Sequence, residues 1–211
     1  MSLTGFTLRP AAARDAGALA AFAERTFRDT FGPHNRAQDM NDYCGAAFTV
    51  ERQLAELDDP ARQVLLLERA GELAGYAMLW AGPVPACVTG GDPVELLRFY
   101  VDRAWHGRGV AAELMGATIA AAGRRGARNV FLAVWERNLR AISFYAKHGF
   151  RDVGSRPFML GSDLQTDRIV VARRRRSDGR ACSRPRTRPE PPPCRAFPVP
   201  SSNAPRCVPR G

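Results

Sequence analysis

The sequence contains no apolar run of about 18 residues, the length at which a helix spans a bilayer, and no N-terminal signal-peptide pattern. Cysteine is also scarce. Of the five cysteines, Cys44 and Cys87 fall within the first 172 residues, and their spacing fits neither a disulfide framework nor a zinc site. We therefore expect one soluble, cytoplasmic domain with no membrane partner and no metal.

Acidic residues are scarce near the C-terminal end, which carries most of the net charge. Residues 173–211 contain eleven arginines, no lysine and two acidic residues, so they hold +9 of the total charge of +10, and residues 1–172 hold +1. This segment is rich in proline and serine and has too little apolar surface to fold. The sequence predicts a folded domain over 1–172 and a basic, disordered tail over 173–211. Nucleic acid is not an expected partner, because the basic charge is confined to the tail.

The middle of the domain reads as a strand, a short turn and a helix. An apolar run ends at Val101, the turn contains Gly107 and Gly109, and good helix formers follow over 111–122. The first N–H groups of a helix lack intrahelical partners and suit an anion such as a phosphate. Arg108 adds a positive charge beside them.

Two familiar phosphate loops are missing at this turn. No Lys-Ser or Lys-Thr pair follows the glycines, so a P-loop is excluded. Ala112 stands where the dinucleotide fingerprint has its third glycine, and the following strand, 130–134, ends without an acidic residue for the ribose. A tight connection that binds nothing stays open as an alternative.

Two motifs, in the right order, resemble the GCN5-related N-acetyltransferase (GNAT) superfamily. The first, His106-x-x-Gly109-x-Ala111 after a strand, is similar to the acetyl-CoA loop Gln/Arg-x-x-Gly-x-Gly/Ala. The second, which runs from Asn138 to Phe150, is similar to Asn-x-x-Ala-x-x-x-Tyr-x-x-x-Gly-Phe. The resemblance covers roughly residues 5 to 172 and implies an acetyl-CoA-dependent N-acetyltransferase.

Three further segments look like one branch of this superfamily. Residues 134–138, 158–161 and 165–169 are similar to the PaiA-type N-acetyltransferases, which are associated with polyamine acetylation. This narrower resemblance makes a polyamine one candidate for the acceptor.

The resemblance and the periodicity of the chain predict an α/β fold with a twisted, mixed sheet of about seven strands and helices on both faces. The expected strands are 6–9, 64–68, 73–80, 94–101, 130–134, 150–153 and 167–172. The expected helices are 11–31, 49–57, 109–124 and 138–148, with Thr49 and Asn138 as N-caps. The polar stretch 34–43 is given no element. The strand–helix–strand unit from 94 to 134 should be parallel, and the last two strands should be antiparallel.

The resemblance also implies where acetyl-CoA binds. The pyrophosphate would lie on main-chain N–H groups of 107–112, and the pantetheine arm would pair with the edge of the strand ending at Val101. A main-chain N–H near Phe99 would polarise the thioester carbonyl. The cofactor-binding positions are Phe99, Tyr100, Val101, His106, Gly107, Arg108, Gly109, Val110, Ala111, Ala112 and Asn138. For His106, a side chain that faces water is the alternative.

Glu95 is the candidate general base. It lies eleven residues before His106, the separation at which histone-acetylating members carry their catalytic glutamate. Simple alternation would place Glu95 on one strand face with Leu97, Phe99 and Val101. The alternative is a half-exposed strand glutamate without a chemical role.

Tyr145 is the second catalytic candidate. It matches the superfamily's tyrosine that protonates the departing CoA thiolate, although Ile142, Tyr145 and His148 also fit simple packing on one helix face. Nothing near Cys87 reads as a base that would activate it. We therefore expect direct transfer in a ternary complex rather than a ping-pong mechanism.

The sequence thus predicts acetyl transfer to a primary amine of a small molecule, with polyamines among the candidates. A protein or peptide N-acetyltransferase and a catalytically silent CoA-binding regulatory module are the alternatives. Asp29, Asp39 and Asp42 are either contacts for a cationic acceptor or a solvated acidic surface. The oligomeric state stays open, a homodimer included.

Overall fold

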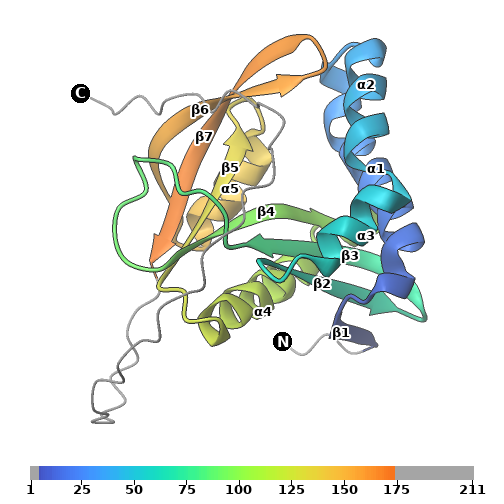
Figure 1. Ribbon diagram of the computed structural model, residues 1–211, viewed down its shortest axis with the longest axis horizontal. Coiled ribbons are helices and arrows are strands. Elements are labelled where there is room, and N and C mark those ends of the chain that lie inside the picture. Colours follow the sequence, from blue (N-terminus) through green and yellow to red (C-terminus); the bar gives the residue numbers. More distant parts are fainter. Residues whose placement is uncertain (1–4, 174–211) are drawn as a thin grey trace, which may run out of the picture.

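One sheet of seven strands organises the domain. The computed structural model describes residues 5–173, so the predicted tail beyond Arg173 lies outside the described residues. The strand order is β1-β2-β3-β4-β5-β7-β6, and all neighbours are antiparallel except β4 and β5 (Figure 1). The strands are β1 (Phe6–Pro10), β2 (Arg62–Arg69), β3 (Glu72–Trp80), β4 (Pro93–Val101), β5 (Asn129–Trp135), β6 (Arg151–Leu160) and β7 (Asp163–Arg173). The predicted mixed sheet is confirmed.

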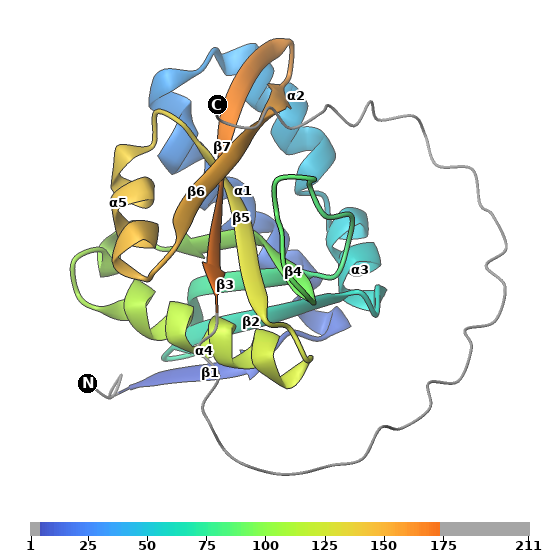
Figure 2. The same cartoon turned by 90° about the vertical axis from the view of Figure 1, so that its left-hand side faces the viewer.

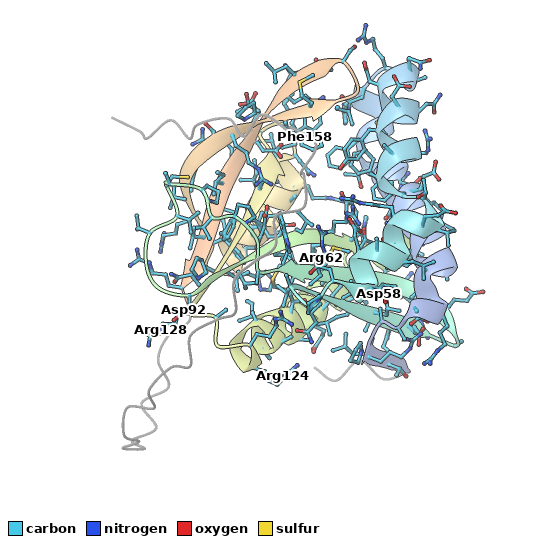
Figure 3. All side chains as sticks on the ribbon, viewed as in Figure 1. Asp58, Arg62, Asp92, Arg124, Arg128 and Phe158 are labelled. Atoms are coloured by element: carbon cyan, nitrogen blue, oxygen red, sulfur yellow. The ribbon has the colours of Figure 1, made fainter. Side chains whose placement is uncertain are left out.

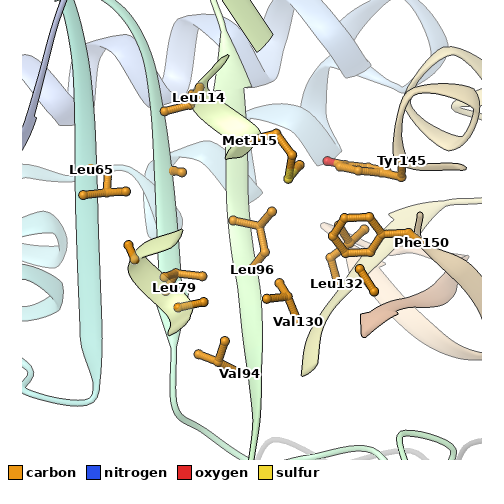
Figure 4. Packing of buried hydrophobic residues seen from close by; sticks show 14 of the residues in the cluster. Leu65, Leu79, Val94, Leu96, Leu114, Met115, Val130, Leu132, Tyr145 and Phe150 are labelled. Carbon is orange, nitrogen blue, oxygen red and sulfur yellow. The ribbon is translucent and has the colours of Figure 1, made fainter. Parts of the chain in front are cut away.

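Helices cover both faces of this sheet, as predicted (Figures 1 and 2). They are α1 (Ala16–Phe31), α2 (Ala37–Ala47), α3 (Val50–Asp58), α4 (Val110–Arg124) and α5 (Leu139–Lys147). Side chains of β2 and β3 alternate between the faces. Leu66 and Met78 pack with α1 and α2, whereas Leu65 and Leu79 pack with α4 (Figure 4). Among the described residues, no helix is long and apolar enough to cross a membrane.

Strands β4 and β5 separate soon after they meet. Their parallel pairing joins Pro93–Glu95 to Asn129–Phe131, although both strands continue further. Beyond Glu95, the edge of β4 that faces β5 has no strand partner within residues 5–173. Such an edge presents N–H and C=O groups with which an extended ligand can pair.

A β-bulge changes which side chains of β4 share a face. The register with β3 shifts by one residue at Leu97. Glu95 and Leu97 therefore face the α1–α3 side, whereas Phe99 and Val101 pack on the α4–α5 side. The prediction that all four share one face is wrong, because simple alternation does not count the inserted residue.

Two parts of the chain are more regular than predicted. Residues 37–47 form α2, which buries Met40 and Cys44 one turn apart but has no side-chain N-cap, so its sequence carries little helix signal. Strands β6 and β7 form one long hairpin instead of the short strands 150–153 and 167–172. Pro157 and partly exposed polar residues hide the alternation there. In contrast, the helix expected over 11–31 begins only at Ala16, after one 3-10 turn.

The turn of the β6–β7 hairpin is hydrogen-bonded to α2. Asp39 Oδ1 accepts hydrogen bonds from Ser162 N at 2.7 Å and Ser162 Oγ at 2.9 Å, while Arg36 Nε donates to Asp39 Oδ2 at 2.7 Å. A Cβ at Gly161 would lie 2.5 Å from Asp39 Cα, and Gly161 has a φ of +59°. The turn thus requires glycine for both space and conformation.

We expect Gly161→Ala to destabilise the fold by about 2–3 kcal/mol, because the hairpin must move away from α2 and a left-handed alanine is strained. Denaturant unfolding measures this loss. Gly116→Ala is the matched control, since nothing lies within 4 Å of a Cβ at this helical position. There alanine should stabilise by about 0.5–1 kcal/mol. Equal effects at the two positions would contradict the docking of the hairpin on α2.

Candidate active site

A cavity of about 1020 Å³ passes through the opening between β4 and β5 and joins the two faces of the sheet. Its loop end, on the α4–α5 side, is lined by His106, Gly107, Ala111, Phe144 and Tyr145. Its hairpin end, on the α1–α3 side, is lined by Phe48, Arg62, Arg98, Phe158 and Asp167. Figure 3 labels two residues of the hairpin end, Phe158 on β6 and Arg62 on β2. A cavity lined from both faces of the sheet suits two substrates that meet in the middle.

The glycine turn at the loop end presents unused main-chain donors. Gly107 and Gly109 have φ values of +76° and +81°, and Gly109 is the N-cap of α4. Within residues 5–173, the amides of Gly107, Gly109, Val110 and Ala111 donate to no main-chain carbonyl. Together with the positive end of the α4 dipole, these amides fit a pyrophosphate.

The predicted cradle is shorter than the range 107–112. The amide of Ala112 donates to Gly109 O at 3.0 Å, and the amide of Arg108 reaches Trp105 O at 3.4 Å. These two N–H groups already donate hydrogen bonds within the turn. The prediction that they bind the pyrophosphate is therefore corrected. The guanidinium of Arg108 lies over the Trp105 ring, 5.6 Å from its centroid, and remains close to the turn.

His106 is exposed, but its imidazole does not simply face water. Nε2 lies 2.9 Å from Val101 O, and Nδ1 lies 2.8 Å from Arg140 Nη1. Because arginine can only donate, Nδ1 accepts this bond and Nε2 carries the proton that is donated to Val101 O. His106 therefore ties the end of β4 to α5 and holds Arg140 at the loop end of the cavity.

Tyr145 lines the loop end of the cavity. Asn138 caps α5 by accepting a hydrogen bond from Ala141 N at 3.1 Å, as predicted, and the helix buries the Tyr145 ring against Phe150 and Phe99. Its hydroxyl points toward Met115 (Figure 4) and has no hydrogen-bond partner among residues 5–173. Burial raises the pKa of Tyr145 above its ordinary value, so the phenol keeps its proton at neutral pH.

Glu95 is buried and already paired. Its Oε1 accepts a hydrogen bond from Arg156 Nη2 at 2.8 Å, and only 2% of the residue is exposed. Burial raises the pKa of Glu95, and Arg156 opposes this rise. The alternative of a half-exposed glutamate is thus wrong. The cavity wall, however, includes Arg156 and not Glu95.

Asp167 was missed by the sequence analysis as a functional residue. It lies on β7 opposite Arg156 of β6, at the hairpin end of the cavity, and 8% of it is exposed. Burial raises its pKa to about 6. A signal existed in the sequence: Asp167, Ile169 and Val171 alternate, so one acidic side chain shares a face with buried apolar ones.

Arginines dominate the rest of the hairpin end. Glu56 of α3 is buried and accepts hydrogen bonds from Arg52, Arg62 and Arg98. The guanidinium of Arg98 also lies over the Phe48 ring, 5.2 Å from its centroid. This ionic cluster fixes α3 to β2 and β4 and forms one wall of the cavity.

The three early aspartates do not line this cavity. Asp39 holds the hairpin turn, Asp42 accepts a hydrogen bond from Gln38, and Asp29 lies 3.9 Å from Arg25. For Asp39 and Asp42, the proposed contact with a cationic acceptor is therefore not supported by their positions. Asp29 lines a second, smaller pocket that shares His106 and Asn138 with the cavity, so its contact stays a prediction. The acidic residues that line the cavity are Glu56 and Asp167 instead.

Comparison with known proteins agrees with this geometry. The family model described as acetyltransferase (GNAT) family matches residues 20–150. The chain belongs to this family. It is accordingly an N-acetyltransferase, and acetyl-CoA is its co-substrate.

Two relatives match this GNAT protein over nearly their full lengths. An uncharacterised N-acetyltransferase of Mycobacterium tuberculosis is 37% identical over 158 residues, which are 74% of this chain and 96% of the relative. One from Lactobacillus delbrueckii is 29% identical over 169 residues, 80% of this chain and 97% of the relative.

Solved structures share the fold. PaiA N-acetyltransferase from Thermoplasma acidophilum, in complex with coenzyme A, has a TM-score of 0.65 at 18% identity and covers 82% of this chain and 100% of its own. A GCN5-related N-acetyltransferase from Kribbella flavida has a TM-score of 0.59 at 25% identity, with 82% and 99% covered.

Proposed function

We propose that this N-acetyltransferase transfers the acetyl group directly from acetyl-CoA to a primary amine of a small molecule, with both substrates bound at once. The observation that carries the proposal is the cavity through the sheet. Its loop end offers main-chain donors for a pyrophosphate, and its hairpin end offers a carboxylate for an amine. Because these two groups lie at different ends of the cavity, both substrates can be bound before they react.

The groups needed for the transfer line the same cavity. The pantetheine arm pairs with the unpartnered edge of β4, where an N–H near Phe99 polarises the thioester carbonyl. The amine attacks the carbonyl carbon, a C–N bond forms and the C–S bond breaks. Tyr145 donates its proton to the departing sulfur. This order needs no acetylated enzyme.

The charges at the hairpin end affect which acceptor can bind there. The wall contains four arginines and two acidic residues: Arg52, Arg62, Arg98, Arg156, Glu56 and Asp167. A polycation would therefore meet more positive than negative charge, despite the PaiA-like motifs. We infer that a monoamine, or an amine that carries a carboxylate, is a better acceptor than spermidine.

Release of CoA thiol by the full-length chain tests this function. The acceptors are spermidine, simple monoamines, amino acids and N-terminal peptides. We expect acceptor-dependent release that is faster with monoamines or amino acids than with spermidine, and initial rates that fit a ternary complex. Release with peptides alone would replace the small-molecule acceptor, and parallel double-reciprocal lines would overturn direct attack. The cytoplasmic location and a homodimer stay predictions from the sequence.

A further inference from the structure

We propose that Asp167, rather than Glu95, binds the ammonium group of the acceptor and takes its proton, and that Glu95 acts by holding Arg156 away from Asp167. This inference rests on the proposed function and deepens it, because it names the base and the subsite for the amine. The two carboxyl groups lie on the same face of the sheet, one on β4 and the other on β7.

The first argument is access. Asp167 is more than nine-tenths buried and lines the cavity, and its carboxylate accepts no hydrogen bond from any residue in the described range 5–173. A buried carboxylate without a partner is costly, so such a group indicates that a ligand supplies the partner. An ammonium group that enters from the hairpin end would supply it.

The second argument is that Glu95 is occupied. Arg156 stands directly opposite Asp167 in the β6–β7 pairing, yet its guanidinium turns to Glu95 at 2.8 Å. No ion pair within 4 Å joins Arg156 to Asp167 in the described part of the chain. Glu95 thus neutralises the arginine that would otherwise pair with Asp167. By this contact Glu95 is a positioning residue.

The surroundings make Asp167 a usable base. Burial raises its pKa to about 6, Arg156 of β6 lowers it, and the charges of Glu95 on β4 and Glu136 after β5 raise it. The phenol of Tyr43, from α2, also faces this region. A carboxyl group with this pKa is ionised at pH 7 and above, and is a better proton acceptor than an ordinary aspartate.

Atoms and protons balance in this scheme. The ammonium group gives one proton to the Asp167 carboxylate, which later releases it to solvent. The neutral amine attacks the thioester, and the C–S bond breaks. Tyr145 protonates the sulfur, and the remaining extra proton on the attacking nitrogen restores the Tyr145 phenol. The products are the acetamide, CoA thiol and one released proton.

The test compares the pH dependence of kcat/KM for the full-length chain and three variants. The unmodified chain should lose activity as the pH falls through about 6, since protonated Asp167 accepts no proton. Asp167→Asn should lower kcat/KM by about hundredfold and abolish this acid limb. Glu95→Gln should keep the limb but move it to lower pH, because Arg156 is released to pair with Asp167. Asp163→Asn, on the exposed part of β7, should leave the profile unchanged.

The opposite pattern would overturn the inference. If Glu95→Gln abolishes the limb and Asp167→Asn keeps it, Glu95 is the base and the proposed function still stands. Titration of acetyl-CoA into Asp167→Asn shows that this variant is folded. The carbon-13 resonance of the Asp167 carboxyl group, followed by NMR, gives a readout that is independent of turnover, and a midpoint below pH 5 would also overturn the inference. Thiol release with no acceptor would overturn the proposed function, and this inference with it.

Discussion

Replacing Tyr145 with phenylalanine should lower kcat by roughly 10²–10⁴-fold, the usual contribution of a general acid. The dissociation constant for acetyl-CoA should stay the same, because the ring keeps its packing against Phe150 and Phe99. The physical reason is the state of the hydroxyl. It borders the cavity, it has no hydrogen-bond partner among residues 5–173, and the pKa that burial of the residue raises keeps the proton in place until a thiolate develops nearby. Steady-state kinetics and direct titration of acetyl-CoA measure the two quantities.

Tyr76→Phe is the matched control for this prediction. The hydroxyl of Tyr76 likewise has no hydrogen-bond partner among residues 5–173, but Tyr76 is fully buried and does not line the cavity. Loss of a hydroxyl that makes no hydrogen bond within the protein should not destabilise either variant. We therefore expect Tyr76→Phe to keep the normal kcat. An unchanged kcat in Tyr145→Phe would assign Tyr145 to aromatic packing alone.

The parts of the site that depend on residues close together in the sequence were predictable. The glycine turn, the Asn138 cap and Tyr145 lie on local motifs, where spacing alone fixes the geometry. The structure places these three elements around one cavity, as the motifs require. Only the use of the Ala112 and Arg108 amides within the turn departs from that prediction.

The parts that depend on long-range register were not predictable. The bulge at Leu97 is a property of the β3–β4 pairing, and it moves Glu95 to the face opposite Phe99. The alternation of Asp167 with Ile169 and Val171 indicates a shared face, but that this face meets the cavity depends on the β6–β7 hairpin, much of which is half-exposed. No local sequence pattern shows that Arg156 pairs with the carboxylate of Glu95 and not with that of Asp167.

The ionic cluster around Glu56 should have the largest effect on stability. We expect Glu56→Gln to lower the free energy of unfolding by about 3–5 kcal/mol, because it leaves the buried guanidinium of Arg98 without a counter-charge, while Arg62 keeps only its ion pair with Asp59. The side chains of Arg98 and Arg62 are 11% and 12% exposed, so water replaces little of what is lost. Thermal unfolding should show a decrease of roughly 6–20 °C for a domain of this size.

Glu51→Gln provides the control on the same helix. Glu51 is exposed in the first turn of α3, where its charge should contribute no more than about 1 kcal/mol through the helix dipole. Equal effects of Glu51→Gln and Glu56→Gln would mean that desolvation cancels the attraction within the cluster.

A double variant, Glu56→Gln with Arg98→Gln, separates the desolvation cost from the attraction between the charges. It should be less destabilised than the sum of the single variants, because it removes the uncompensated charge as well as its partner. The cavity wall formed by α3 thus depends on a balance of charges, and the same balance limits which acceptors the hairpin end admits.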